Sequence, residues 1–422
     1  MIQNMQKPDV LVVGAGAAGL MAAGTAASRG LTVWLAEKNA APGKKLGITG
    51  KGRCNLTNDC IIPLFLENVP TNPRFLYGAL NRFSPADTKA FFEGLGVPLK
   101  TERGRRVFPQ SDKASDIVDA LTNWVTQTGV YTIRGSAERL LTRAGHAAGV
   151  QMSDGRRIEA EQVILCCGGA SYSSTGSNGS GYRIAAEAGH TILPLKPSLV
   201  PLTCAGEECR DMMGLSLRNV SCTFYDNVRK KEVHREFGEM LFTHFGVSGP
   251  IILSASAHLR EMSVGRYRMD IDLKPALSLE KLDARLLRDI SAHPARAFSN
   301  ALTDLLPHKL IPVVVQRSGI PAFTKCGEIT REQRHDLIHL LKAFSFTITG
   351  SRPLEEAIVT SGGVSTKEVD PRTMQSKKIP GLYFAGEILD VDGYTGGYNL
   401  QIAFSTGRVA GENVQGTYAP ES

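Results

Sequence analysis

The alternation of apolar and glycine-rich stretches at the start of the chain predicts a strand, a tight turn, a helix and a second strand. Residues 9–13 include a short apolar run, and an alanine-rich stretch follows a glycine-rich turn as far as Arg29. Gly30 stands where a glycine often ends a helix, and residues 31–36 form the next apolar run, which leads to Glu37. This order predicts one βαβ unit.

Further along, hydrophobic spacing predicts elements that complete this first domain. Residues 114–127 have the spacing of an amphipathic helix, and residues 130–165 alternate as short strands around Asp154 and Gly155, which predicts a β-meander. From Ala357 the glycine-rich character of the N-terminal part returns. We therefore expect both ends of the chain to build one discontinuous dinucleotide-binding domain.

The middle of the chain, residues 195–350, has a different character. It begins with strands separated by turn residues. Helical spacing then covers residues 278–317, with Ser278 as a suitable N-cap. A capping box of Thr330 with Gln333 predicts a further helix. We interpret this region as an insertion into the first domain.

The first turn carries a dinucleotide-binding fingerprint, Gly14-x-Gly16-x-x-Gly19. Gly14 permits the tight turn, Gly16 lets the backbone approach a pyrophosphate, and Gly19 lets the helix pack close to the strand. The helix N-terminus offers free N–H groups to the phosphates. Glu37 ends the second strand, where an acid binds ribose hydroxyls, so a 2′-phosphate is disfavoured and NADP is excluded at this position. NAD and FAD both remain open.

Two further segments favour FAD over NAD. Residues 43–58 predict a loop whose backbone N–H groups and basic side chains lie along a pyrophosphate and a flavin edge. Near the C-terminus, Gly386 allows close approach and Glu387 is placed to bond ribityl hydroxyls. A helix is expected from about Asn399 to Gly407, with its positive end toward flavin N1 and O2. A second strand–glycine–acid element that returns to the first nucleotide site can bind the flavin end of the cofactor, while the first element binds the adenine nucleotide end. This arrangement favours FAD.

Composition adds a few limits. The chain has 422 residues, 42% hydrophobic and 21% charged, which suits two or three globular domains. Its net charge of +7 suits an anionic ligand without proving nucleic-acid binding. Basic residues gather within 44–53 and again at Arg103, Arg105 and Arg106, where a solvated face is the alternative interpretation.

The cysteines and the apolar runs exclude other classes. None of the eight cysteines has C-x-x-C spacing, so we expect no metal site and no disulfide reductase. The apolar run at residues 10–27 carries glycines in phosphate-loop spacing and has no basic segment before it. We therefore expect a cytoplasmic protein with reduced thiols and no membrane partner.

These motifs together resemble the BaiN/YhiN-type family of FAD-dependent, aminoacetone-oxidase-like oxidoreductases. The resemblance runs in order across nearly the whole chain. The matching stretches are residues 13–19, 43–58, 107–109, 168–181, 199–202, 238–250 and 360–411. Two departures stand out: Cys166 and Cys167 replace an Ala-Thr pair that is frequent in the family, and Ser180 replaces an acid. Neither departure threatens flavin binding.

The resemblance implies an α/β fold in which a discontinuous Rossmann-type FAD-binding domain carries an inserted β-barrel domain and a helical subdomain. We expect the FAD-binding domain at residues 1–194 and 351–422. The barrel, as substrate domain, is expected at residues 195–274 and 324–350, and the helical subdomain at residues 275–323.

The resemblance also implies an oxidoreductase that moves hydride between flavin N5 and a small molecule, by reduction of a carbon–carbon double bond or by amine oxidation. One alternative is an RNA-modifying flavoenzyme that reduces uridine to dihydrouridine in ribosomal RNA. Another is a flavin-binding regulatory protein without turnover. The fold cannot choose among these. The sequence lacks a second Gly-x-Gly-x-x-Gly unit, so NAD(P)H is expected only as a transient electron donor.

Two residues are candidates for catalysis. His244 lies in the segment 240–250, which we expect to cover the flavin, and it suits an acid or base near neutral pH. The alternative is a structural histidine bonded to a backbone carbonyl. Cys54 lies in the loop expected at the flavin and could be a proton donor or redox thiol, or else a small buried side chain.

The cofactor-binding residues that we predict come from the fingerprint, the basic loop and the C-terminal segment. They are Gly14, Gly16, Ala17, Ala18, Gly19, Glu37, Lys38, Lys45, Gly52, Arg53, Cys54, Asn55, Gly168, Gly386, Glu387, Gly397, Asn399 and Leu400.

Overall fold

The computed structural model describes residues 7–416 and divides into two units. Unit 1 takes in the chain up to Ser198 and again from Leu354, and unit 2 is Leu199–Pro353. These two units are defined by compactness alone, so the domain limits expected from the sequence stay predictions.

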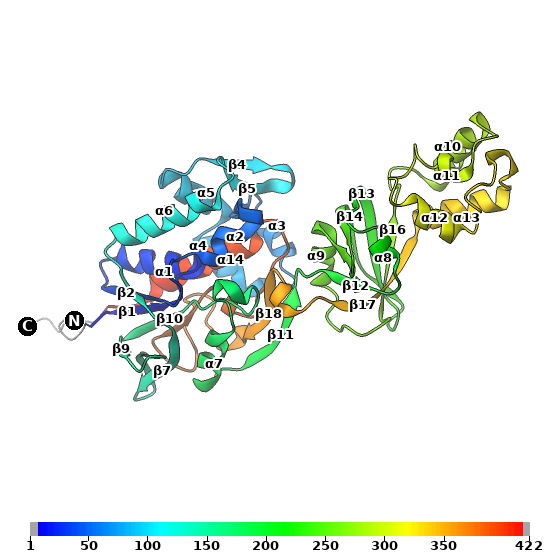
Figure 1. Cartoon of the computed structure of the whole chain (residues 1–422). Helices are drawn as coiled ribbons and strands as arrows, with labels where there is room; N and C mark the ends of the chain where they lie inside the picture. Colours follow the sequence, from blue (N-terminus) through cyan, green and yellow to red (C-terminus); the bar gives the residue numbers. More distant parts are fainter. Residues whose placement is uncertain (1–6, 417–422) are drawn as a thin grey trace, which may run out of the picture. The chain divides into compact units, whose positions relative to one another are not determined.

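Unit 1 is built on a parallel five-stranded sheet with the order β19-β10-β1-β2-β6. Its strands are β1 (Val10–Val13), β2 (Val33–Glu37), β6 (Tyr131–Arg134), β10 (Gln162–Leu165) and β19 (Leu382–Phe384). The chain leaves β1 toward β2 and β6 on one side and returns to β10 and β19 on the other. Figure 1 labels β1, β2 and β10 close together in this unit. The strand order therefore reverses between β1 and β10, where open α/β sheets bind their ligands.

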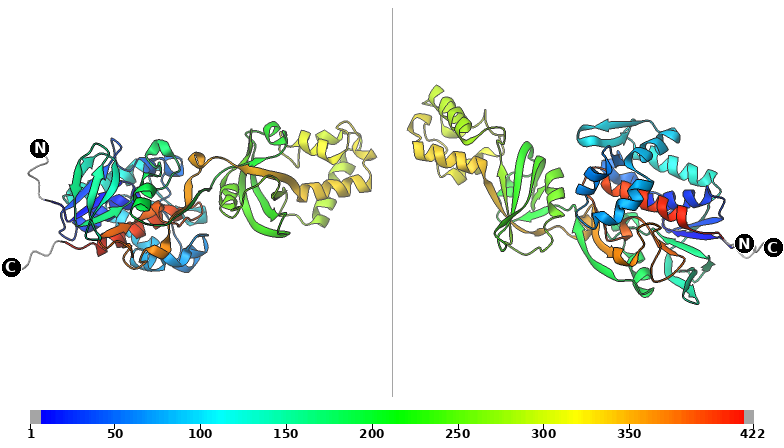
Figure 2. Two further views of the ribbon diagram at one scale, coloured as in Figure 1. Left: turned by 90° about the horizontal axis from the view of Figure 1, so that it is seen from below. Right: turned by 180° about the vertical axis from the view of Figure 1, so that it is seen from behind.

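Two helices from opposite ends of the sequence pack closely in this unit. They are α1 (Ala17–Ala27) and α14 (Tyr398–Asn413). An ideal Cβ at Gly407 would lie 2.4 Å from the carbonyl oxygen of Ala18, and one at Gly411 would lie 2.5 Å from that of Ala22. Only glycines fit this crossing. Figure 2 shows the red C-terminal helix lying within the blue N-terminal part of the unit.

Smaller elements surround the sheet of unit 1. The helices are α2 (Lys44–Gly52), α3 (Ile62–Glu67), α4 (Tyr77–Arg82), α5 (Pro85–Gly94), α6 (Ala114–Gln127) and α7 (Ser180–Glu187). The antiparallel strands are β3 (Thr57–Asn58), β4 (Leu99–Glu102) and β5 (Arg106–Pro109), then β7 (Ala137–Arg143), β8 (His146–Met152) and β9 (Arg157–Glu159), and the pair β11 (Ile192–Ser198) and β18 (Val359–Val364). The β-meander expected around Asp154 is confirmed as β7-β8-β9.

One predicted element of unit 1 is wrong. Residues 43–58 were expected to form a loop, yet Lys44–Gly52 is the helix α2, which loses helical geometry only at Thr49, Gly50 and Lys51. Leu46 is buried at 2% exposure, and α2 packs on α6. This apolar anchor and the helix-forming lysines before it outweigh the glycines at either end.

Unit 2 contains a closed six-stranded barrel with the order β12-β15-β14-β13-β16-β17. Its strands are β12 (Leu202–Cys204), β13 (Ser216–Asp226), β14 (Lys231–Thr243), β15 (Gly246–Ser248), β16 (Tyr267–Asp272) and β17 (Phe344–Ser351). The short helices α8 (Glu208–Asp211) and α9 (Pro250–Ser256) lie against it. A separate core of apolar side chains, including Phe224 and Phe242, fills this unit.

Four further helices precede the last barrel strand. They are α10 (Leu279–Ala292), α11 (Phe298–Ala301), α12 (Ile311–Ser318) and α13 (Arg331–Lys342). The N-cap at Ser278 and the capping box at Thr330 are confirmed by the expected side-chain hydrogen bonds. Helix α13 packs against α10 and α12.

The α/β class, the Rossmann-type sheet and the inserted barrel with helices are therefore confirmed. Among residues 7–416, no helix combines the length and the apolar character needed to cross a membrane.

Candidate functional site

The three fingerprint glycines serve different purposes in the structure. An ideal Cβ at Gly14 would lie 2.5 Å from the carbonyl oxygen of Cys166, and one at Gly19 would lie 1.7 Å from that of Gly14. Both glycines are therefore required by the packing of the protein itself. At Gly16 the same Cβ would meet nothing within 4 Å, and the backbone is extended with φ −82°. The open space at the start of α1 is where a phosphate can approach backbone N–H groups.

Glu37 lies at the end of β2 and is 9% exposed. Its carboxylate accepts hydrogen bonds from the backbone N–H of Ala15 at 2.7 Å, and from the backbone and side-chain nitrogens of Asn39 at 2.7 and 2.8 Å. A carboxylate accepts about four hydrogen bonds, so about one position remains for a ribose hydroxyl. Asn39, which the sequence analysis missed, fixes the orientation of this acid.

A segment after β10 folds onto the end of β2. The Asn39 amide donates to the carbonyl oxygen of Thr175 at 3.1 Å, and Lys38 Nζ donates to Asn178 Oδ1 at 2.8 Å. Lys44 Nζ reaches the carbonyl oxygen of Ser174 at 2.8 Å. Lys38 was predicted to bind the cofactor, and in the structure its ammonium group is already held by this segment.

A second polar cluster joins four parts of unit 1 that lie far apart in sequence. Lys45 Nζ donates to Glu387 Oε2 at 2.6 Å and to Ser171 Oγ at 2.9 Å. Glu387 Oε1 accepts from Ser171 Oγ at 3.1 Å and from the backbone N–H of Thr360 at 2.9 Å. The predicted residues Lys45 and Glu387 are thus brought together, while Ser171 and Thr360 are additions that only the structure reveals.

The start of α14 is held in place by glycines and by Asn399. Gly397 has φ 98°, and an ideal Cβ on it would lie 2.3 Å from the backbone of Thr57. The Asn399 side chain accepts from the backbone N–H of Gly393 at 2.8 Å and donates to its carbonyl oxygen at 2.7 Å. The side chain of Asn399 is therefore used to shape its own turn, which leaves the free N–H groups of the helix end, up to Leu400, for a ligand.

Arg53 has a structural role that the sequence did not suggest. Its guanidinium donates to Glu102 at 2.5 Å and to Asp112 at 2.5 and 2.9 Å. The same group lies 4.2 Å from the centre of the Phe108 ring. These contacts occupy most of its donors, so the structure gives no support to the predicted role of Arg53 in cofactor binding.

The two residues after Arg53 differ in what they offer to a ligand. Cys54 is fully buried, and this burial raises the pKa of its thiol to about 12. A protonated thiol inside the core is a poor proton donor or redox group, so the structure favours the packing role for Cys54. Asn55 Oδ1 is buried without a hydrogen-bond partner among the described residues. A buried acceptor of this kind needs a donor, which the N–H or hydroxyl groups of a flavin cofactor can supply.

The residues of unit 1 therefore fit an FAD molecule: Gly16 leaves space, Glu37 keeps an accepting position, and Asn55 lacks a donor. The remaining predicted positions are consistent with tight backbone geometry. Gly52 has φ 83° with open space around it, Gly168 has φ 71°, and Gly386 has φ 80°.

His244 lies in unit 2, in the turn between β14 and β15, and its side chain is exposed. Its ring contacts Phe245 edge-on at 4.9 Å, and within the described chain it makes no hydrogen bond. The described residues thus offer no carbonyl partner for a structural histidine here, and the catalytic role of His244 stays a prediction. Next to it, Thr243 Oγ1 is buried and has no partner among the described residues.

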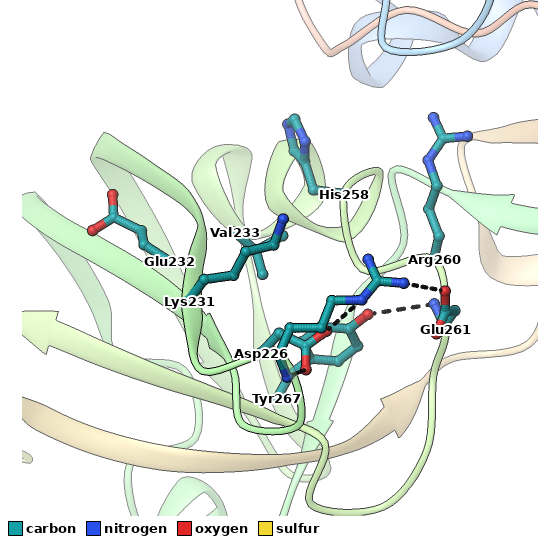
Figure 3. Close-up of a pocket in the computed structure, with 9 residues that line it drawn as sticks. Asp226, Lys231, Glu232, Val233, His258, Arg260, Glu261 and Tyr267 are labelled. Atoms are coloured by element: carbon teal, nitrogen blue, oxygen red, sulfur yellow. Dashed lines mark hydrogen bonds and ion pairs between the residues drawn. The ribbon is translucent and has the colours of Figure 1, made fainter.

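A hollow of about 200 Å³ lies elsewhere in unit 2. Figure 3 shows Lys231, His258 and Arg260 around it, with the carboxylates of Asp226 and Glu261 among them. Acidic and basic side chains are balanced in its lining, and none of the predicted site residues lies there. This hollow is therefore a poor candidate for the site of the reaction.

Residues 8–413 match the family model described as the HI0933-like protein Rossmann domain. This chain belongs to that family. It is 33% identical over 407 residues to the 3-dehydro-bile acid delta(4,6)-reductase of Clostridium scindens, with 95% of this chain and 97% of the relative covered. It is 32% identical over 406 residues to the ribosomal RNA dihydrouridine synthase of Escherichia coli, with 95% and 96% covered.

Solved structures support the fold of this HI0933-like protein. A flavocytochrome c3 fumarate reductase matches with a TM-score of 0.52 and 18% identity, covering 97% of this chain and 78% of the other. A 3-ketosteroid-delta4-(5alpha)-dehydrogenase of Rhodococcus jostii matches with a TM-score of 0.50 and 14% identity, covering 98% of both chains. The predicted BaiN/YhiN-type family and the predicted class, a flavin-dependent oxidoreductase with FAD as cofactor, are confirmed.

Proposed function

We propose that this HI0933-like protein reduces a carbon–carbon double bond conjugated to a carbonyl group, in a small-molecule substrate. The observation that supports it is that two relatives, each aligned over 95% of this chain, are named for reactions of this one type. A delta(4,6)-reductase saturates double bonds of a 3-oxo steroid, and dihydrouridine synthesis saturates the double bond of a uracil ring. The substrates differ, while the bond that is reduced does not.

When bound and reduced, FAD would supply the hydride for the carbon of the double bond that is remote from the carbonyl. The other carbon must then receive a proton, so that two hydrogens are added in all. His244 is the proposed proton donor, because its exposed imidazole has no hydrogen-bond partner within the described residues and an imidazolium group can donate a proton in general acid catalysis. Thr243, with its unpartnered hydroxyl, is the neighbour best placed to orient a substrate oxygen.

We assign the cofactor to groups of unit 1. Backbone N–H groups at Gly16, Ala17 and Ala18 bind the pyrophosphate, and Glu37 binds one ribose hydroxyl. Lys45 and Glu387 would bind the ribityl part, and the positive end of α14 would stabilise negative charge on the reduced flavin. The proposed electron donor is NADH or NADPH, bound transiently. Anaerobic addition of either nucleotide should bleach the flavin absorbance if this is correct.

The test uses the direction of electron flow. The FAD-loaded protein is reduced without oxygen and mixed with a conjugated enone steroid, while flavin absorbance is followed by stopped flow. Reoxidation, with a product heavier by two hydrogens, is the expected result. The saturated analogue of the same steroid serves as control. Amine oxidation predicts the reverse: amines bleach the oxidised flavin, and the enone leaves the reduced flavin unchanged.

Ribosomal RNA is the second candidate substrate, because the relatives from Escherichia coli and Haemophilus influenzae are both named ribosomal RNA dihydrouridine synthase. The same stopped-flow assay distinguishes it. A uridine-containing ribosomal RNA fragment would then reoxidise the flavin much faster than the steroid does, and mass spectrometry would detect dihydrouridine.

A further inference from the structure

An exposed group of three arginines lies beside the proposed flavin edge. Arg103, Arg105 and Arg106 are all exposed and belong to the tight turn that joins β4 to β5. Gly104 has φ 77° and Arg105 has φ 60°, a left-handed geometry that residues other than glycine rarely adopt. The turn is therefore held in one conformation by its surroundings.

Asn58 ties this turn to the start of α14. Its side-chain amide is buried and donates to the carbonyl oxygen of Gly104 at 3.1 Å and to that of Gly396 at 3.0 Å. The backbone N–H of Asp59 donates to the carbonyl oxygen of Arg105 at 2.7 Å. One amide thus contacts both the arginine turn and the glycine turn that precedes α14, so the two turns are neighbours.

The charge of Arg105 reaches the same region. Burial raises the pKa of the Tyr398 hydroxyl, and the positive charge of Arg105 acts against this rise. Tyr398 is the first residue of α14. Arg105 is therefore near enough to the Tyr398 side chain for its positive charge to act on that hydroxyl.

The three arginines differ in how their side chains are used. Arg106 Nε donates to the carbonyl oxygen of Arg103 at 3.1 Å, and its guanidinium lies 5.8 Å from the Phe108 ring centre and 3.9 Å from Glu102. Arg106 therefore stabilises the turn. The side chains of Arg103 and Arg105 have neither a hydrogen bond nor an ion pair within residues 7–416. Arg53, by contrast, takes up the nearby carboxylates of Glu102 and Asp112.

We propose that Arg103 and Arg105 bind an oxyanion of the substrate, a carboxylate or a phosphate, and thereby orient the substrate at the flavin edge. The inference rests on the proposed function, because it needs the flavin at the start of α14. Paired guanidinium groups suit planar or tetrahedral oxyanions, since each presents several N–H donors in a fixed geometry. A steroid acid carries one such group, and an RNA strand carries one phosphate per nucleotide.

The test compares charged ligands with neutral ones of the same shape. A conjugated 3-oxo bile acid is paired with its methyl ester, and a short uridine-containing RNA with the nucleoside uridine. Each ligand is titrated into the full-length, FAD-loaded protein, and Kd is measured from the change in flavin absorbance. The test variant is R103Q/R105Q. The control is R143Q/R157Q, which removes two exposed arginines from the β7-β8-β9 sheet, where no predicted cofactor residue lies.

We expect the natural protein and the control to bind the charged member of a pair more tightly than the neutral one. R103Q/R105Q should weaken binding of the charged ligand by about tenfold or more and leave the neutral ligand unchanged. The dependence of Kd on salt concentration distinguishes an RNA phosphate from a carboxylate as the bound oxyanion. Two RNA phosphates predict a slope of log affinity against log salt of about −1.4, most of which the variant loses, while a single carboxylate predicts a shallower slope.

Equal affinity of R103Q/R105Q and the natural protein for both charged ligands would overturn the inference. So would a natural protein that binds the ester as tightly as the acid and uridine as tightly as RNA. The proposed function is judged separately, by reoxidation of the reduced flavin with the neutral ester. Reoxidation at the same rate in all three proteins, without any preference for charge, leaves the proposed function standing and removes only the arginine site.

Discussion

Gly16 and Gly19 offer a matched pair of substitutions, because the structure assigns opposite effects to the same added methyl group. At Gly16 an ideal Cβ would meet nothing within 4 Å, and φ is −82°, which alanine adopts without strain. In the apoprotein, Gly16→Ala gains about 0.4–1 kcal/mol from the less flexible unfolded chain. It loses a similar amount because alanine is a poorer N-cap. The melting temperature of the apoprotein should therefore change by less than about 3 °C.

The affinity for FAD, unlike the melting temperature of the apoprotein, should change strongly in Gly16→Ala. The methyl group of Gly16→Ala occupies the space through which a phosphate reaches the start of α1. Loss of one hydrogen bond to a charged group is worth about 1.5–3 kcal/mol, which corresponds to about a ten- to hundredfold increase in Kd. A titration of apoprotein with FAD, followed by quenching of flavin fluorescence, measures this change directly.

Gly19→Ala should destabilise the protein itself. Its Cβ would lie 1.7 Å from the carbonyl oxygen of Gly14, so the helix or the turn must shift, at a cost of about 1–3 kcal/mol or more. A melting temperature well below that of Gly16→Ala is expected in the absence of FAD. The reasoning is refuted if Gly16→Ala binds FAD as the natural protein does, or if it lowers the melting temperature of the apoprotein as much as Gly19→Ala.

Four further outcomes are expected. Glu37→Gln should raise the Kd for FAD by about tenfold or more, since a charged acceptor is lost; an unchanged titration would remove Glu37 from the ribose. Arg53→Ala should lower the melting temperature and leave FAD affinity intact, because its guanidinium is used by carboxylates; weaker FAD binding would restore its predicted role. His244→Ala should slow substrate-dependent flavin turnover by about 10²–10⁴-fold without lowering the melting temperature, because the side chain is exposed; a destabilised but active variant would contradict this. Burial lowers the pKa of His258 from 6.5 to about 4, and the positive charges of His234 and Arg260 add to this effect. As the pH falls, the unfolded chain therefore binds a proton at His258 before the folded protein does. The free energy of unfolding should decrease between about pH 6.5 and about pH 4. Denaturant melts of His258→Gln should lose that part of the pH dependence.

Local features of this protein were predictable because they depend on residues a few positions apart. The helix expected at residues 114–127 has the same limits in the structure, and the caps at Ser278 and Thr330 form as expected. The fingerprint at Gly14 likewise follows a strand and opens a helix. Each of these is decided by hydrophobic period, by capping chemistry or by a glycine at a fixed offset.

The C-terminal end of helix α14 could not be predicted from its local sequence. Gly407 was expected near its end, yet the helix continues to Asn413. Gly407 and Gly411 are instead the points at which α14 touches the backbone of α1. A glycine that breaks an isolated helix is tolerated here because the close packing of two helices compensates for its lower helix propensity.

The direction of the charged side chains was decided only by the tertiary structure. Sequence spacing placed both Arg53 and Lys45 at the cofactor, but Arg53 meets Glu102 and Asp112, and Lys45 meets Glu387, which lies 342 residues away. A sequence pattern states which groups are present and on which element. Which charges pair depends on how the sheet brings distant strand ends together, and a long side chain takes the partner that is then within its reach.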